Sequence, residues 1–112
     1  MQESPVINRT QELFESVCKI TGKLPTLTKQ TIGRRLEDGI LQLLELLIMS
    51  KYAPKAHKRA YLIKTSALSG IIQFQQRILL TQKLANETTL HQLQAKTVEI
   101  CRMLGGWRKS VQ

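Results

Sequence analysis

Apolar residues recur every three or four positions along four stretches of this chain, and short breaks separate these stretches. Spacing of this kind places the apolar side chains on one side of an α-helix. Leu and Ile dominate the apolar set and aromatic residues are few, which suits helix packing better than a β-sandwich. The pattern therefore predicts an all-α chain with helices at about residues 6–21, 28–52, 55–83 and 90–109.

The breaks carry start and stop signals for these helices. Gly22 is expected to end the first helix, and Thr28 to cap the second. Pro54 precedes the third helix, and Thr89 followed by Gln92 fits a capping box for the fourth. Because all three connections are short, consecutive helices must run antiparallel. Residues 1–112 are thus expected to form one domain, an up-down-up-down four-helix bundle.

Each predicted helix contributes one apolar stripe to the expected core. The fourth stripe is the most regular, because its positions alternate at three and four residues, the 3.5-residue seam typical of helix bundles. In chain order the stripes are Leu13, Phe14, Val17 and Ile20; Ile32, Leu36, Ile40, Leu43, Leu44, Leu47 and Ile48; Ala60, Tyr61, Ala67, Leu68, Ile71, Ile72, Phe74, Ile78 and Leu79; and Leu90, Leu93, Thr97, Ile100, Leu104, Trp107 and Val111.

The charge of the chain is concentrated around the predicted third helix. The net charge is +9 and the pI is about 10, and residues 46–86 hold seven basic residues without any Asp or Glu. The outer face of the third helix is therefore predicted to be almost purely cationic, and the charge points to RNA, DNA or an anionic membrane surface as partner. The candidate nucleic-acid-binding residues are Lys55, Lys58, Arg59, Lys64, Arg77 and Lys83, with Arg34 and Arg35 on the second helix.

Two other interpretations of this charge are open. The basic face could merely keep a structural protein in solution, although solvated faces usually interleave opposite charges to gain pairs four residues apart. Small helical enzymes such as chorismate mutases turn basic groups inward, but here apolar stripes already occupy the expected core positions. With one Asp, two His and no Gly-rich phosphate loop, the sequence predicts no catalytic residue, no metal ligand and no cofactor.

The sequence predicts no membrane contact. No uninterrupted apolar run approaches the roughly 18 residues that a bilayer requires, so a cytoplasmic protein is expected. Cys18 and Cys101 lie far apart in the sequence and fit no metal or redox spacing. Both are expected to be buried, reduced thiols.

Three short motifs resemble one family. Glu45-Leu46-Leu47-Ile48, Phe74-x-x-Arg77-x-Leu79 and Arg102-Met103-Leu104-Gly105-Gly106-Trp107 are similar to elements of the accessory variability determinant (Avd) of diversity-generating retroelements. The resemblance extends from about Leu13 to Val111, and the Arg-x-Leu-Gly-x-Trp element is its most specific part.

The resemblance implies a basic four-helix protomer that assembles into a homopentameric ring. In that family the ring binds nucleic acid and the reverse transcriptase of the retroelement, and supports mutagenic cDNA synthesis and retrohoming. Arg77 matches a basic position of the family's third helix, whereas the neighbouring Gln73, Gln75 and Gln76 depart from its more aromatic and basic pattern. Trp107 is expected to fill the end of the bundle or a subunit seam, without touching a ligand.

A related branch gives an alternative. Leu36-Glu37-Asp38-Gly39 resembles the Ile-Ala-Glu-Gly element of the four-helix-bundle proteins encoded in rRNA intervening sequences, whose role is unclear. The function expected from the sequence is thus a non-enzymatic, nucleic-acid-binding partner of a reverse transcriptase. The alternatives are the rRNA-linked bundle protein and a purely structural homo-oligomer.

Overall fold

The computed structural model describes residues 4–111, and every element in that range is helical. These elements are α1 (Pro5–Thr21), α2 (Thr26–Thr28), a π-helical stretch (Lys29–Gly33), α3 (Arg34–Tyr52), α4 (Lys55–Thr81) and α5 (Glu87–Val111). Because α2, the π-helical stretch and α3 follow one another without a break, the described chain has four long helical segments. The prediction of an all-α chain with four helices is confirmed.

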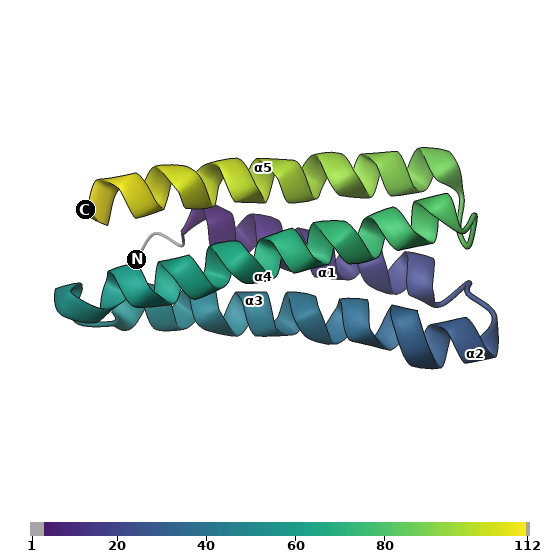
Figure 1. Ribbon diagram of the computed structural model, residues 1–112, viewed down its shortest axis with the longest axis horizontal. Helices are drawn as coiled ribbons and strands as arrows, with labels where there is room; N and C mark the ends of the chain where they lie inside the picture. The colour runs from purple at the N-terminus through teal and green to yellow at the C-terminus, as the bar shows by residue number, and fades with distance from the viewer. Residues whose placement is uncertain (1–3, 112) are drawn as a thin grey trace.

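The four segments lie side by side and run alternately in opposite directions (Figure 1). The molecule is elongated, with extents of 44 × 25 × 22 Å. α3 packs against α4, α4 against α5, and α1 against both α3 and α5. Consequently α4 begins, and α3 and α5 end, at the same end of the molecule, while the turn between α4 and α5 lies beside the α1–α2 loop at the other end (Figure 1).

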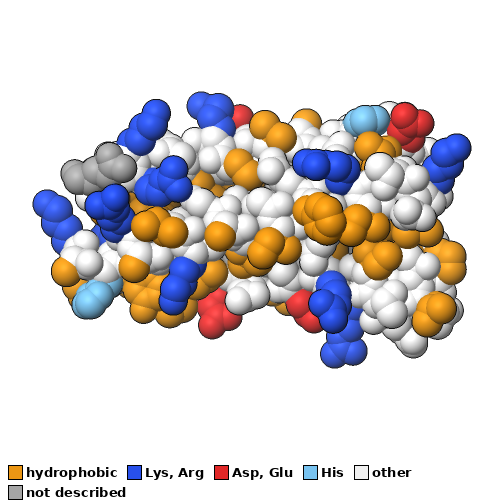
Figure 2. Space-filling view, viewed as in Figure 1, with side chains coloured by type: hydrophobic (Ala, Val, Ile, Leu, Met, Phe, Trp, Pro, Cys, Tyr) orange, Lys and Arg blue, Asp and Glu red, His pale blue; other side chains and the backbone are white. Residues whose placement is uncertain are grey.

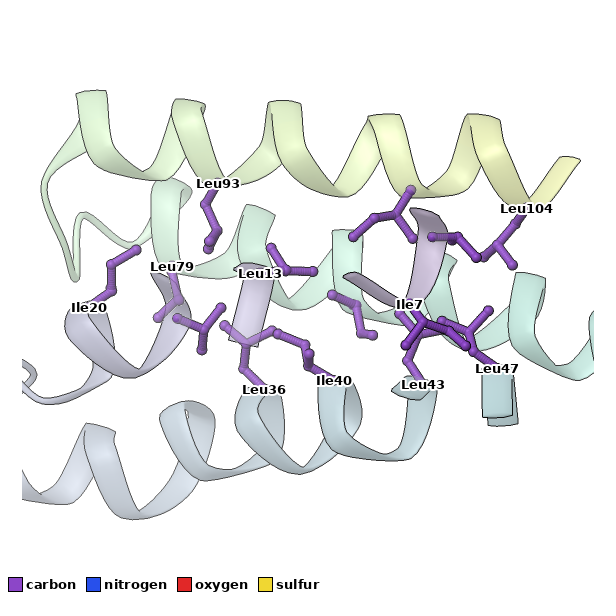
Figure 3. Close-up of a cluster of buried hydrophobic side chains, with 14 of the residues drawn as sticks. Ile7, Leu13, Ile20, Leu36, Ile40, Leu43, Leu47, Leu79, Leu93 and Leu104 are labelled. Carbon is purple, nitrogen blue, oxygen red and sulfur yellow. The ribbon is translucent and has the colours of Figure 1, made fainter. Parts of the chain in front are cut away.

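Leucine and isoleucine side chains from all four segments fill the centre of the bundle (Figure 3). The apolar stripe predicted for α5 is confirmed. Its first five residues are buried, and Trp107 and Val111 are half-buried against the core. The stripes of α1 and α3 are also largely buried, with the exception of Ile48, which is 42% exposed. The fully buried large side chains are Leu13, Leu36, Ile40, Leu43, Leu47, Leu62, Ile72, Leu79, Leu90, Leu93, Ile100 and Leu104.

The predicted stripe of α4 is wrong for several of its members. Ala60, Ala67, Ile71 and Phe74 are exposed, whereas only Ile72 and Leu79 of the predicted set are fully buried. The face that packs inward includes polar residues that no apolar pattern would select. The buried residues of α4 are Leu62, Thr65, Ser69, Ile72, Gln76 and Leu79.

Each of these buried polar residues makes a side-chain hydrogen bond, although the side-chain oxygen of Gln76 has no partner within residues 4–111. The Thr65 hydroxyl donates to the carbonyl oxygen of Tyr61 at 2.6 Å, and Ser69 donates to that of Ser66 at 2.7 Å. The Gln76 amide nitrogen reaches across to α5 and donates to the Thr97 hydroxyl at 2.7 Å. A hydroxyl that bonds to its own helix avoids most of the desolvation cost of an unpaired polar group.

Two of the predicted helix caps are also wrong. Helical structure begins at Thr26, directly after Pro25, so Thr28 lies inside the helix and makes no capping hydrogen bond. α5 begins at Glu87, because the Asn86 side-chain oxygen accepts the backbone N–H of Thr89 at 3.0 Å. Asn is among the best N-cap residues, so the helix starts three residues earlier than the Thr89 capping box predicted.

The C-terminal end of α4 is closed by a residue in the left-handed region. Lys83 has φ of 54°, and its N–H bonds to the carbonyl oxygen of Leu80 at 3.1 Å. The next N–H, of Leu84, bonds to the carbonyl oxygen of Leu79 at 3.0 Å. This pair of bonds is the Schellman motif, in which glycine is the usual residue at the Lys83 position.

Replacing Lys83 with glycine should therefore stabilise the fold. Removing the Cβ relieves a strain of roughly 1 kcal/mol, and the larger backbone entropy of glycine in the unfolded chain offsets part of this gain. We expect an increase of up to about 1 kcal/mol in the free energy of unfolding for Lys83→Gly, measured by urea denaturation. Gln82→Gly, at a neighbouring residue with negative φ, is the control and should be destabilising. If both variants lose stability, the left-handed conformation of Lys83 is not the dominant factor.

Candidate nucleic-acid interface

The eight predicted contact residues do not form one surface. Along α4, Lys55 and Arg77 are separated by about 33 Å at the helical rise of 1.5 Å per residue. Lys55, Lys58 and Arg59 lie at the beginning of α4, whereas Arg77 and Lys83 lie towards its other end. Arg34 and Arg35 also belong to that other end, because α3 starts there (Figure 1).

One end of the bundle gathers cations from three helices. α3 ends, α4 begins and α5 ends there, and Lys and Arg side chains crowd this end in the space-filling view (left in Figure 2). No Asp or Glu occurs in residues 46–86 or after Glu99. We call this surface the basic end, and it consists of Lys51, Lys55, Lys58, Arg59, Arg108 and Lys109.

Two of these lysines also have local interactions. The Lys58 ammonium group donates to the carbonyl oxygen of Lys51 at 2.9 Å and so satisfies one of the free carbonyl groups at the end of α3. The Lys51 ammonium group lies 5.4 Å from the centre of the Tyr52 ring, within the range of a cation–π contact. Lys55, Arg59, Arg108 and Lys109 are exposed, so at least four cations of the basic end are accessible to phosphates.

The remaining predicted residues are exposed but scattered. Arg34 lies 3.9 Å from the Asp38 carboxylate, a surface ion pair with both side chains mostly in solvent. Arg35, Lys64 and Arg77 are exposed without such a partner among the ion pairs found in residues 4–111. Lys83 is exposed and is the left-handed residue of the Schellman motif that ends α4. These residues add to the general positive field without completing the basic end.

The outer face of α4 is apolar rather than purely cationic, which contradicts the expectation from the sequence. Ile63, Ile71 and Phe74 are 48%, 53% and 58% exposed, and Ala67 is exposed between them. Their spacing of four, four and three residues keeps them on one side of the helix. We call Ile63, Ala67, Ile71 and Phe74 the apolar ridge; apolar side chains run along the middle of the face shown in Figure 2, where α4 lies in front.

The prediction of two buried thiols is wrong. Cys18 is exposed and Cys101 is half-buried, and both are free. Partial burial of the thiol raises the pKa of Cys18 above its ordinary value, and the nearby Glu37 carboxylate raises it further by a smaller amount. Since the thiolate is the reactive form, Cys18 is less reactive than its exposure alone would imply.

Thiol modification rates should report this pKa. In a Cys101→Ala background, the midpoint of the rate–pH profile for Cys18 should lie above that of a free cysteine peptide. Glu37→Gln should move the midpoint down, because it removes a negative charge that disfavours the thiolate. The midpoint should stay above the peptide value, because burial remains the larger cause. A profile that Glu37→Gln leaves unchanged would contradict the electrostatic contribution.

Metal-ligand clusters and membrane-spanning helices are both absent from residues 4–111. No group of three or more His, Cys, Asp or Glu side chains in that range could hold a metal ion. His91 is exposed beside Glu87 at 3.6 Å, and His57 is exposed on the first turn of α4. None of the helices in the described range is long and apolar enough to span a bilayer.

Comparison of the chain with protein-family models, curated proteins and solved structures found no match.

Proposed function

We propose that this protein binds nucleic acid through the basic end and has no catalytic role. The observation that carries the proposal is the convergence of six basic residues from α3, α4 and α5 on one end, all of them in stretches without Asp or Glu, residues 46–86 and the residues after Glu99. Lys and Arg side chains that neutralise phosphates release condensed counterions, and this release supplies most of the free energy of sequence-independent binding. The exposed ammonium and guanidinium groups suit that purpose.

We further propose that the protein acts as a homo-oligomer, with the apolar ridge in the subunit interface. Exposed apolar side chains grouped on one face often mark an interaction site, whereas single ones are common on any surface. A closed ring of five protomers, as the resemblance to the Avd family implies, would place five basic ends around one axis. Several phosphates of one nucleic acid could then be contacted together.

The specific biological role follows from the resemblance alone. The protein would bind the reverse transcriptase of a diversity-generating retroelement together with RNA or DNA, and support mutagenic cDNA synthesis and retrohoming. The first alternative is the four-helix-bundle protein of the rRNA intervening sequences, whose role is unclear. In a purely structural homo-oligomer, the apolar ridge would still form the subunit interface, and the basic end would bind no nucleic acid.

The salt dependence of oligonucleotide binding tests this proposal. Fluorescence anisotropy titrations with duplex and single-stranded oligonucleotides of unrelated sequences should give similar affinities at one salt concentration. The logarithm of the association constant should fall with the logarithm of salt, by about 0.9 per phosphate contacted on duplex DNA and about 0.7 on single strands. Six basic residues set an upper slope of about −5 per protomer on a duplex. Absence of binding at low salt would favour the structural homo-oligomer.

A further inference from the structure

A groove of about 430 Å³ opens between α1 and α5 at the end of the molecule remote from the basic end. The α1–α2 loop and the α4–α5 turn close this end of the bundle (right in Figure 1). The volume falls within the range of small-molecule sites, roughly 300–1,000 Å³. We call this space the α1–α5 groove.

The apolar part of the groove lining comes from four parts of the chain. Ile20 comes from the end of α1, Leu24 from the following loop and Leu93 from α5. Leu84 and Ala85, directly after the Schellman motif of α4, complete the apolar surface and are half-buried. The groove thus offers a surface for an aliphatic or aromatic group of a ligand.

Three lysines line the same groove. The lining lies within residues 4–111 and contains no Asp or Glu. Lys19 and Lys23 come from the end of α1 and its loop, while Lys96 comes from α5. The Lys96 ammonium group donates to the Ser16 hydroxyl at 2.8 Å and so bridges α5 and α1. None of the ion pairs found in residues 4–111 involves these lysines.

From these observations we infer that the α1–α5 groove binds a small amphiphilic anion. The apolar body of the ligand packs against Ile20, Leu84 and Leu93, and its carboxylate, sulfonate or phosphate group is held by the lysines. Charge complementarity selects the anionic head, since three cations converge without an acidic neighbour in the lining. Medium-chain fatty acids and aryl carboxylates share this chemistry.

A nucleic-acid backbone fits this groove less well than it fits the basic end. A phosphodiester chain is polar along its length and would leave the apolar walls unpaired, and the lining contains no aromatic residue on which a base could stack. The groove is therefore a second site, separate from the proposed nucleic-acid interface. The two sites lie at opposite ends of the bundle (Figure 1).

Two fluorescent probes that differ in one charged group test the inference. Anilinonaphthalene sulfonate carries an aromatic body and an anionic group, whereas N-phenylnaphthylamine has a similar body without charge. We expect the sulfonate to bind the folded protein with saturation at one molecule per chain, and at least tenfold more tightly than the neutral probe. Decanoate below its micellar concentration should displace the sulfonate.

Matched variants locate the site. Lys19→Gln/Lys23→Gln/Lys96→Gln should weaken binding of the sulfonate at least tenfold and leave binding of the neutral probe nearly unchanged. Ala85→Trp should fill the groove and weaken the binding of both probes. The control Lys51→Gln/Lys55→Gln/Lys109→Gln removes the same charge at the basic end and should keep sulfonate binding. Circular dichroism verifies that each variant remains helical.

The results separate this inference from the proposed function. Both are supported if the groove variant loses the sulfonate but keeps oligonucleotide binding, and the basic-end variant does the reverse. Sulfonate binding that survives both the lysine triple variant and Ala85→Trp overturns the inference, because the probe then occupies another surface such as the apolar ridge. Binding to anionic vesicles without binding of monomeric decanoate also overturns it, because the lysines then recognise a membrane surface.

Discussion

Removing four exposed cations from the basic end should abolish most of the affinity for nucleic acid. In Lys55→Gln/Arg59→Gln/Arg108→Gln/Lys109→Gln the formal net charge falls from +9 by four units. If each residue contacts one phosphate, the duplex salt slope should flatten by nearly 4, and affinity at 0.1 M salt should fall on the order of 10³-fold. Lys58 is left in place because its ammonium group bonds to the end of α3. Gln keeps the helix propensity of the replaced residues.

A second variant with the same charge change provides the control. Lys29→Gln/Arg34→Gln/Arg35→Gln/Arg77→Gln removes exposed cations from the other end of the molecule. It should weaken binding only through the lower net charge, with a nearly unchanged slope at salt concentrations where long-range interactions are screened. Equal losses in both variants would show that the whole positive field, rather than the basic end, binds the polyanion. An unchanged slope in the basic-end variant would place the interface elsewhere.

Only those residues of the basic end that are close together in the sequence could be predicted from the sequence. The cluster from Lys51 to Arg59 is visible as a basic run without acidic partners. Arg108 and Lys109 join it only because α5 runs antiparallel to α4, which places the end of one helix beside the start of the other. The same topology moves Arg77 to the far end, although it lies on the same helix as Lys55. Locating the basic end therefore requires the direction of each helix in addition to the positions of the charged residues in the sequence.

The helices differ in how well their inward faces could be predicted. α5 carries a single apolar stripe, so the seam from Leu90 to Leu104 identified the buried face. α4 carries apolar residues on two faces, and periodicity alone does not tell which face turns inward. The core position of Gln76 depends on its bond to Thr97 across the interface. That bond is a property of packing and leaves no signal in an apolar pattern.

The α1–α5 groove is a further feature that the sequence does not predict. Lys19, Lys23 and Lys96 are dispersed over 78 positions and resemble ordinary surface lysines. They come together because α1 ends, and α5 begins, at the same end of the bundle. The cavity itself depends on how closely two helices approach near their ends. Side-chain packing decides this distance, and the spacing of apolar residues along each helix does not.

The second large effect is expected at the apolar ridge, where Ile71→Glu/Phe74→Glu should convert the proposed oligomer into monomers. Burying an Ile or Phe side chain contributes roughly 1.5–3 kcal/mol, and burying an unpaired carboxylate carries an additional cost. Each interface should weaken by at least about 3 kcal/mol, which is on the order of 10²-fold in the dissociation constant. Both side chains are more than half exposed in the protomer, so the fold should survive. Native mass spectrometry and sedimentation velocity measure the oligomeric state.

The control for this variant uses apolar side chains of similar exposure on α3. Leu41 and Ile48 are 45% and 42% exposed, and Leu41→Glu/Ile48→Glu introduces the same two charges. This variant should remain oligomeric if α4 forms the interface, and it would become monomeric if α3 does. The wild-type oligomer should also strengthen as salt is added, because protomers of charge +9 repel one another. A wild-type protein that stays monomeric at micromolar concentration and high salt would contradict an apolar-ridge interface, and five basic ends could then not act together on one nucleic acid.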